Sequence, residues 1–164
     1  MSLFEVAPAG DPEANPSSIV VWTDGACLGN PGPGGWAWAR TPQDFAAGHD
    51  RETTNQRMEL LAVIEALAAN PGPVEIRSDS TYVVHCFRDR WWVNWRARGW
   101  RNAQGKPVAN QDLWSRLIAE VVDRRPGEIS FTWVKGHSDD AMNNIVDELA
   151  TTAARLQSAS SSGD

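Results

Sequence analysis

Residues 19–35 read IVVWTDGACLGNPGPGG, a short apolar run that ends in a carboxylate and a turn rich in glycine and proline. The four consecutive apolar residues from Ile19 to Trp22 are typical of a central strand buried on both faces. The glycines and prolines that follow favour tight turns and end the strand. The stretch therefore predicts an α/β sheet with a polar group, Asp24, at the carboxyl end of a buried strand.

The apolar spacing along the rest of the chain predicts four more strands and four helices. Short apolar or alternating runs indicate strands at residues 35–40, 44–50, 74–78 and 129–133. Apolar residues spaced three and four apart indicate helices after Thr54, over residues 81–87, after Asn110 and near the C-terminus. In the last helix we expect four side chains to face the core: Ile145, Leu149, Ala153 and Leu156.

Length and composition favour one globular domain. The chain has 164 residues, 41% of them hydrophobic and 22% charged, which fits a domain over residues 18–156. Residues 1–17 and 157–164 lack apolar periodicity, and we expect them to be disordered tails. Two cysteines are too few for a disulfide scaffold. No apolar run approaches the ~20 residues of a membrane span and no basic-then-apolar signal begins the chain, so we expect a cytoplasmic protein without a membrane partner.

The charge is unevenly distributed. The net charge is −6, yet residues 88–106 carry six basic residues and one acid, a local charge of +5. The same segment holds four of the nine tryptophans. We call residues 88–106 the basic segment. A basic patch on an acidic protein indicates contact with a polyanion at one place and an acidic site at another.

Four carboxylates stand where α/β proteins gather binding groups. Asp24 and Asp79 each end a predicted strand, and Glu59 and Asp147 lie in the early turns of two predicted helices. Each acid alone could be an ordinary turn, capping or solvated residue. Four converging carboxylates would repel one another unless a cation neutralised them, and oxygen ligands favour hard ions such as Mg²⁺.

Five ordered blocks resemble bacterial type 1 ribonuclease H, and the resemblance covers about residues 19–155. They are TDGACLGNPGPGG (23–35), TNQRMEL (54–60), SDSTYV (78–83), WVKGH (133–137) and DELA (147–150). The resemblance implies a ribonuclease H-like fold: a five-stranded mixed sheet with helices packed on both faces and a basic helical protrusion. It also implies a monomeric endonuclease that hydrolyses the RNA strand of RNA–DNA hybrids without strong sequence specificity, leaving 3′-hydroxyl and 5′-phosphate ends.

The resemblance assigns the catalytic roles residue by residue. It places the metal-binding acids at Asp24, Glu59, Asp79 and Asp147, which would hold two Mg²⁺ ions during catalysis, with Mn²⁺ as an alternative ion. It places a proton-transferring histidine at His137. From the residues alone, His137 could equally be an ordinary exposed loop histidine.

The resemblance also implies a set of contacts with the hybrid. These residues are Asn30, Thr54, Asn55, Gln56, Trp91, Trp92, Arg96, Arg98, Arg101 and Asn110. Thr54 and Asn110 match a family pocket for a DNA-strand phosphate, but Glu52 stands where the family is often basic. The basic segment could instead be a helix anchored by tryptophans with a solvated basic face. Asp139 and Asn144 depart from the family pattern near His137.

Two other functions are consistent with such a fold. A DNA-directed nuclease of the same fold would generally lack both the TNQRMEL block and the basic segment. A non-catalytic hybrid-binding module would be expected to have lost at least one of the four acids, and none is missing. Both features favour the ribonuclease.

Overall fold

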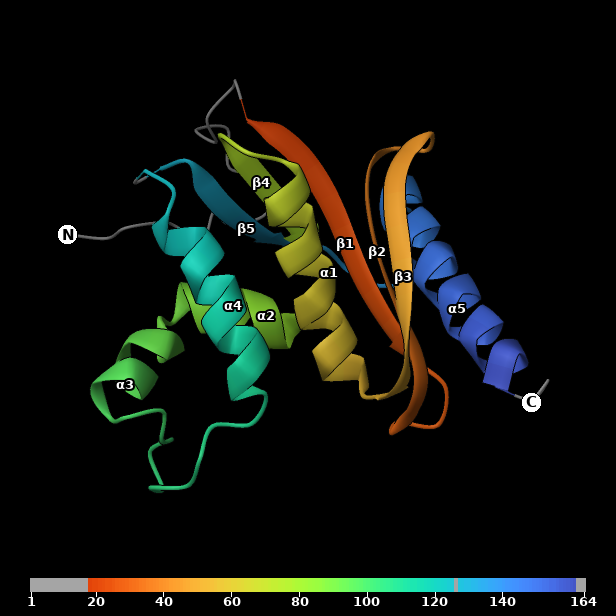
Figure 1. Ribbon diagram of the computed structural model, residues 1–164. Helices are drawn as coiled ribbons and strands as arrows, with labels where there is room; N and C mark the ends of the chain where they lie inside the picture. Colours follow the sequence, from red (N-terminus) through yellow and green to blue (C-terminus); the bar gives the residue numbers. More distant parts are fainter. Residues whose placement is uncertain (1–17, 126, 162–164) are drawn as a thin grey trace.

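The protein is described by a computed structural model that covers residues 18–125 and 127–161 (Figure 1). One five-stranded sheet forms its centre, in the order β3-β2-β1-β4-β5. The strands β1, β2 and β3 are antiparallel neighbours, whereas β1, β4 and β5 run parallel. Their bounds are β1 Ile19–Cys27, β2 Gly32–Thr41, β3 Asp44–Thr53, β4 Val74–Ser78 and β5 Ile129–Trp133.

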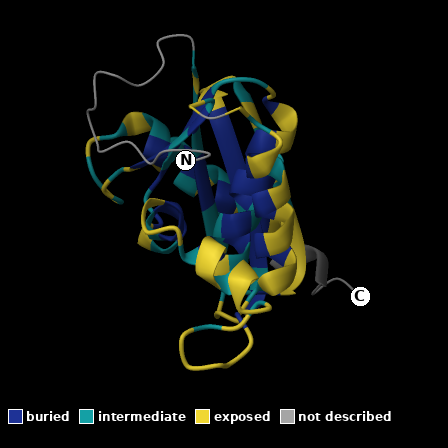
Figure 2. Cartoon of the chain, turned by 90° about the vertical axis from the view of Figure 1, so that its left-hand side faces the viewer, coloured by how far each residue is buried: buried dark blue, intermediate teal, exposed yellow. Residues whose placement is uncertain are grey.

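Helices cover both faces of this mixed sheet, as expected. Their bounds are α1 Asn55–Ala69, α2 Thr81–Arg88, α3 Trp91–Ala97, α4 Gln111–Val122 and α5 Ala141–Ser161. α1, α2 and α4 enclose the larger core, which includes Leu60, Phe87 and Trp114. α5 packs against β1, β2 and β3 over a smaller, alanine-rich core. α3 projects away from the sheet, and an exposed loop connects it to α4 at the lowest point of both views (Figures 1 and 2).

Two glycines on the central strands allow helices to approach the sheet closely. A Cβ at Gly25 of β1 would collide with the backbone of Met58 and Glu59 in α1. A Cβ at Gly35 of β2 would collide with the backbone of α5 at Ala150. Because Gly35 pairs with Ala26, next in sequence to Gly25, the two contacts lie on opposite faces of the sheet. This packing brings Glu59 beside the end of β1.

The last helix differs from the sequence prediction in two ways. Leu156, expected to face the core, is 62% exposed, while Val146, Ala150 and Ala154 are fully buried. Small residues line the contact because α5 lies close to β2 at Gly35. The helix also continues to Ser161, beyond the predicted boundary at 156, because nothing in residues 157–161 breaks a helix. Residues 1–17 and 162–164 of the predicted tails lie outside the described residues.

Among residues 18–125 and 127–161, none of the helices combines the length and apolar character that crossing a membrane requires.

Candidate active site

Three carboxylates from three elements meet beside β1, which does not end at Asp24 as predicted but continues to Cys27. Asp24 lies on β1, Glu59 in the second turn of α1, and Asp79 directly after β4. One oxygen from each lies within 4.8 Å of the others, and no other such group occurs among the described residues. Oxygen donors at this spacing suit a hard divalent cation. The residues therefore fit a divalent metal ion.

Burial and mutual repulsion make these carboxylates difficult to ionise without a cation. Asp24 is 5% exposed, and burial, together with the charges of Asp79, Asp147 and Glu59, raises its pKa to about 8. Burial also raises the pKa of Glu59 and that of Asp79 above their ordinary values. A bound cation would reverse these shifts, because it stabilises the ionised forms.

Asp147 and His137 lie beside this group. The half-buried Asp147 is not one of the three clustered acids, but its charge raises the pKa of both Asp24 and Asp79. His137 is exposed, has a left-handed backbone with φ 52°, and lowers the pKa of Asp79 by its charge. A Cβ at the preceding Gly136 would lie 3.0 Å from an Asp79 oxygen, so this loop passes close to the acids.

Two neutral side chains donate hydrogen bonds to the carboxylates, and neither was predicted from the sequence to have a role. The Ser80 hydroxyl donates to Glu59 Oε2 at 2.8 Å and accepts from the backbone N–H of Val83 at the start of α2. Asn143 Nδ2 donates to Asp79 Oδ2 at 3.4 Å. The sequence around Ser80 indicates only that serine is a good helix-capping residue; it does not indicate a contact with Glu59. Its contact with Glu59 joins residues 21 apart in the chain.

A cleft of about 440 Å³ is lined by residues of the β1–β2 turn, of the start of α1 and of the segment that precedes α4. Its lining brings together four of the predicted contact residues and one further residue: Asn30, Thr54, Gln56, Asn110 and Ala109. Asn55 lies next to this cleft, and its backbone N–H donates to Asn30 Oδ1 at 3.0 Å. Glu52 is exposed at the end of β3 and is not among the lining residues.

The basic segment combines packed tryptophans with exposed arginines. Trp92 is 4% exposed and belongs to the core, while Trp91 is half-buried and packs against it. Of this pair, only Trp91 is partly accessible to solvent. The guanidinium of Arg96 lies 5.8 Å from the centre of the Trp92 ring. Arg96, Arg98 and Arg101 are all exposed.

Comparison with known proteins agrees with this arrangement. The family model described as RNase H matches residues 16–155. A ribonuclease H from Acidiphilium cryptum (strain JF-5) is 46% identical over 146 residues, covering 85% of this chain and 89% of the relative. A ribonuclease H from Gluconobacter oxydans (strain 621H) is 48% identical over 138 residues, covering 81% of this chain and 89% of the relative.

A solved structure shows the same fold. It is the crystal structure of LC9-RNase H1, described as a type 1 RNase H with the type 2 active-site motif. That structure superposes with a TM-score of 0.70 at 32% identity, covering 85% of this chain and 74% of that one. The family model covers most of the chain and the curated relatives match over nearly their whole length. This chain belongs to the RNase H family.

Proposed function

We propose that the chain is an endonuclease that hydrolyses the RNA strand of RNA–DNA hybrids, using Mg²⁺ and leaving 3′-hydroxyl and 5′-phosphate ends. The observation that carries the proposal is the convergence of Asp24, Glu59 and Asp79 within 4.8 Å in a chain of this family. We further propose a cytoplasmic monomer that cuts without strong sequence specificity. Light scattering of the purified protein tests the monomeric state.

In the proposed mechanism, Asp24, Glu59, Asp79 and Asp147 would hold the metal. When bound, Mg²⁺ supplies charge that lowers the pKa of water and stabilises charge on the transferring phosphate. Ser80 and Asn143 orient Glu59 and Asp79 through their hydrogen bonds. His137 transfers a proton beside the acids, a task that suits an exposed imidazole.

The hybrid would be held at two places. The neutral amides and hydroxyl of the cleft would donate hydrogen bonds to a strand phosphate and to groups in the minor groove. The exposed Arg96, Arg98 and Arg101 would neutralise other phosphates, and the partly accessible Trp91 would lie against the DNA strand. The buried Trp92 would support Trp91 without contacting the strand.

The proposal is tested with labelled RNA–DNA, RNA–RNA and DNA–DNA duplexes, each in Mg²⁺ or in EDTA. We expect cleavage of the RNA strand of the hybrid only, and only in Mg²⁺. Asp24→Asn, which keeps the shape but removes a ligand charge, should abolish that cleavage. Cleavage of DNA–DNA would favour a DNA-directed nuclease. Binding of the hybrid without cleavage in Mg²⁺ or Mn²⁺ would favour a non-catalytic binding module.

A further inference from the structure

Arg57, in the first turn of α1, forms an ion pair with Asp112 in the first turn of α4. The two terminal guanidinium nitrogens lie 2.9 and 2.7 Å from the two carboxylate oxygens, a bidentate geometry. The hydrogen bond from Arg57 lowers the pKa of Asp112 to about 2, so the carboxylate remains charged at neutral pH. The side chains are 32% and 65% exposed, so the pair contributes little stability. The Arg57–Asp112 ion pair therefore fixes the orientation of the guanidinium but adds little to the free energy of unfolding.

The same guanidinium contacts Asn110, which lines the cleft. Nη1 of Arg57 lies 3.4 Å from Asn110 Oδ1. Because a guanidinium carries only donors, the amide atom that faces it must be the oxygen. Asn110 occupies the N-cap position of α4 with φ 62°, but its side chain does not cap the helix. Its amide oxygen is directed to Arg57 instead.

Tyr82 of α2 lies near Asn110. Burial raises the pKa of Tyr82, and hydrogen bonds from Trp114 and Asn110 oppose that rise. Only the amide nitrogen of Asn110 can donate such a bond. The Tyr82 oxygen also accepts from Trp114 Nε1 at 2.7 Å, and Trp114 is fully buried. With its oxygen directed to Arg57, the Asn110 amide leaves its nitrogen, the only donor of the group, available to the cleft that Asn110 lines.

We propose that Arg57 is a positioning residue: held by Asp112, it keeps Asn110 turned so that the amide N–H faces the cleft and donates to a phosphodiester oxygen. The inference rests on the proposed function, in which the cleft holds one strand of the hybrid. None of the described residues that line the cleft is charged, so its attraction for an anion depends on which amide atoms face inward. An inverted Asn110 would present its oxygen and repel the phosphate.

A double-mutant cycle on the full-length protein tests this role. Arg57→Ala and Asn110→Ala, alone and combined, are assayed for KM and kcat on an RNA–DNA hybrid in Mg²⁺. Each single change should raise KM ~10-fold, the effect of one lost hydrogen bond to a charged group, with little change in kcat. The double variant should be no worse than either single one, because Arg57 acts through Asn110. Arg57→Lys should restore KM only in part, because one ammonium cannot replace the bidentate guanidinium.

Arg116 provides the matched control. It forms an ion pair of 3.7 Å with Glu65 between the same two helices and does not line the cleft. Arg116→Ala should leave KM unchanged, both alone and in the Asn110→Ala background. A residue that merely connects α1 to α4 should behave in this way.

Three results would overturn the inference. Additive effects of Arg57→Ala and Asn110→Ala on KM would show that Arg57 does not act through the amide. A lower melting temperature for Arg57→Ala with an unchanged KM would show a purely structural role. If Asn110→Ala alone leaves KM unchanged while the hybrid is still cleaved, the cleft does not hold the substrate, and the inference fails although the proposed activity stands. Failure of the unsubstituted protein to cleave the hybrid would refute the proposed function itself.

Discussion

Two arginines connect α1 to α4, one at each end of the helix pair, and they do so in opposite ways. At the N-terminal ends, Arg57 is partly exposed and pairs with the carboxylate of Asp112. At the C-terminal ends, Arg124 is 8% exposed and donates mainly to backbone carbonyls. The side chain of Arg124 joins carbonyls at the end of α1 to a carbonyl of α4. The partly exposed Arg57 orients a side chain beside a cleft.

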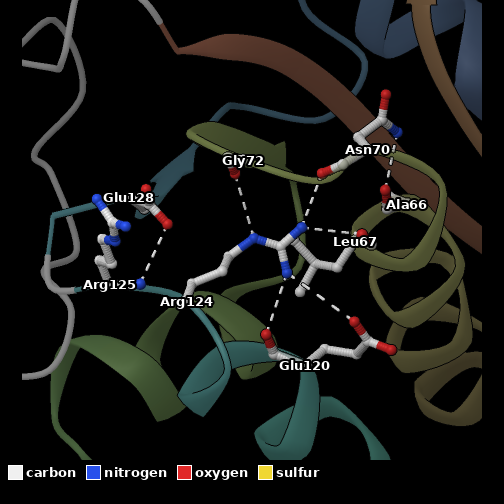
Figure 3. A network of polar contacts seen from close by, with 8 residues as sticks. All are labelled: Ala66, Leu67, Asn70, Gly72, Glu120, Arg124, Arg125 and Glu128. Atoms are coloured by element: carbon white, nitrogen blue, oxygen red, sulfur yellow. Dashed lines mark hydrogen bonds and ion pairs between the residues drawn. The ribbon is translucent and has the colours of Figure 1, made fainter.

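The C-terminal end of the pair is closed by hydrogen bonds within the protein (Figure 3). The guanidinium of Arg124 donates to the carbonyls of Leu67, Asn70, Gly72 and Glu120 at 2.7–3.3 Å. The last carbonyls of a helix lack helical donors, and at the end of α1 the Leu67 carbonyl accepts from both Arg124 and the backbone N–H of Asn70. This end serves stability.

The N-terminal end keeps its polar groups available. Thr54 Oγ1 accepts from the backbone N–H of Arg57 and caps α1. Asn55 and Gln56 are exposed, and Glu59 points to the other acids. The two ends of α1 therefore differ in role. The N-terminal end carries Glu59 and residues of the cleft, whereas the C-terminal end is held by Arg124 and contributes to stability.

The largest effect should follow from removing a ligand charge at the N-terminal end. Glu59→Gln keeps the shape and the bond to Ser80 but loses one charge of the metal site. We expect hybrid cleavage to fall ~10³-fold or more, because metal stabilisation of the transition state is worth several kcal/mol. The melting temperature without metal should not fall, since a buried charge is removed. Steady-state cleavage and thermal unfolding of the same preparation check both expectations, and near-normal cleavage would remove Glu59 from the site.

Removing the arginine at the C-terminal end should have the reverse effect. Arg124→Ala removes four hydrogen bonds to backbone carbonyls and should lower the free energy of unfolding by about 3 kcal/mol. The kcat and KM of the folded protein should be unchanged. Denaturant unfolding and hybrid cleavage are measured together, with the exposed neighbour Arg125 replaced by Ala as the control. Equal losses in the two variants would contradict the structural role of Arg124.

The acids should make stability depend on pH when metal is absent. The pKa of Asp24 is about 8 in the folded protein against 3.8 ordinarily, so between these values the unfolded chain releases its proton while the folded one retains it. Stability should therefore fall as pH rises from about 4 to 8, by up to about 1.4 kcal/mol per pH unit, and then level off.

Unfolding in EDTA across this range, with Asp24→Asn as the comparison, measures the effect. The variant should be more stable than the unsubstituted protein at pH 8 and should lose most of the pH dependence. A variant with the same slope as the unsubstituted protein would assign the effect to other groups.

The smallest effect on stability should follow from Arg57→Ala. An ion pair this exposed should contribute less than ~1 kcal/mol to the free energy of unfolding. The same denaturant titration that reveals the loss for Arg124→Ala should therefore separate the two arginines clearly. If Arg57→Ala destabilises the protein as much as Arg124→Ala, the contrast between the two ends of the helix pair is wrong.

Local patterns in the sequence were sufficient for the elements and for the acids. The strands at 74–78 and 129–133 and the helix after Thr54 occur where the apolar spacing predicts them. Asp79 directly after β4 and Glu59 early in α1 occur where local patterns predict them. The predicted strand end at Asp24 is wrong, because β1 stays paired with β2 as far as Cys27. Asp24 was nevertheless singled out before any contact was known. The family blocks around them then predicted the fold.

Contacts between distant residues were decided only in the tertiary structure. The pairing of Arg57 with Asp112 joins residues 55 apart, and no periodicity encodes it. Trp92 and Trp91 are neighbours of the same type, yet only packing against the core determines that Trp92 is buried. Leu156 continues the apolar spacing of α5 but extends past the sheet into solvent. Periodicity specifies which side chains share a face of an element, whereas burial and pairing depend on which other element meets that face.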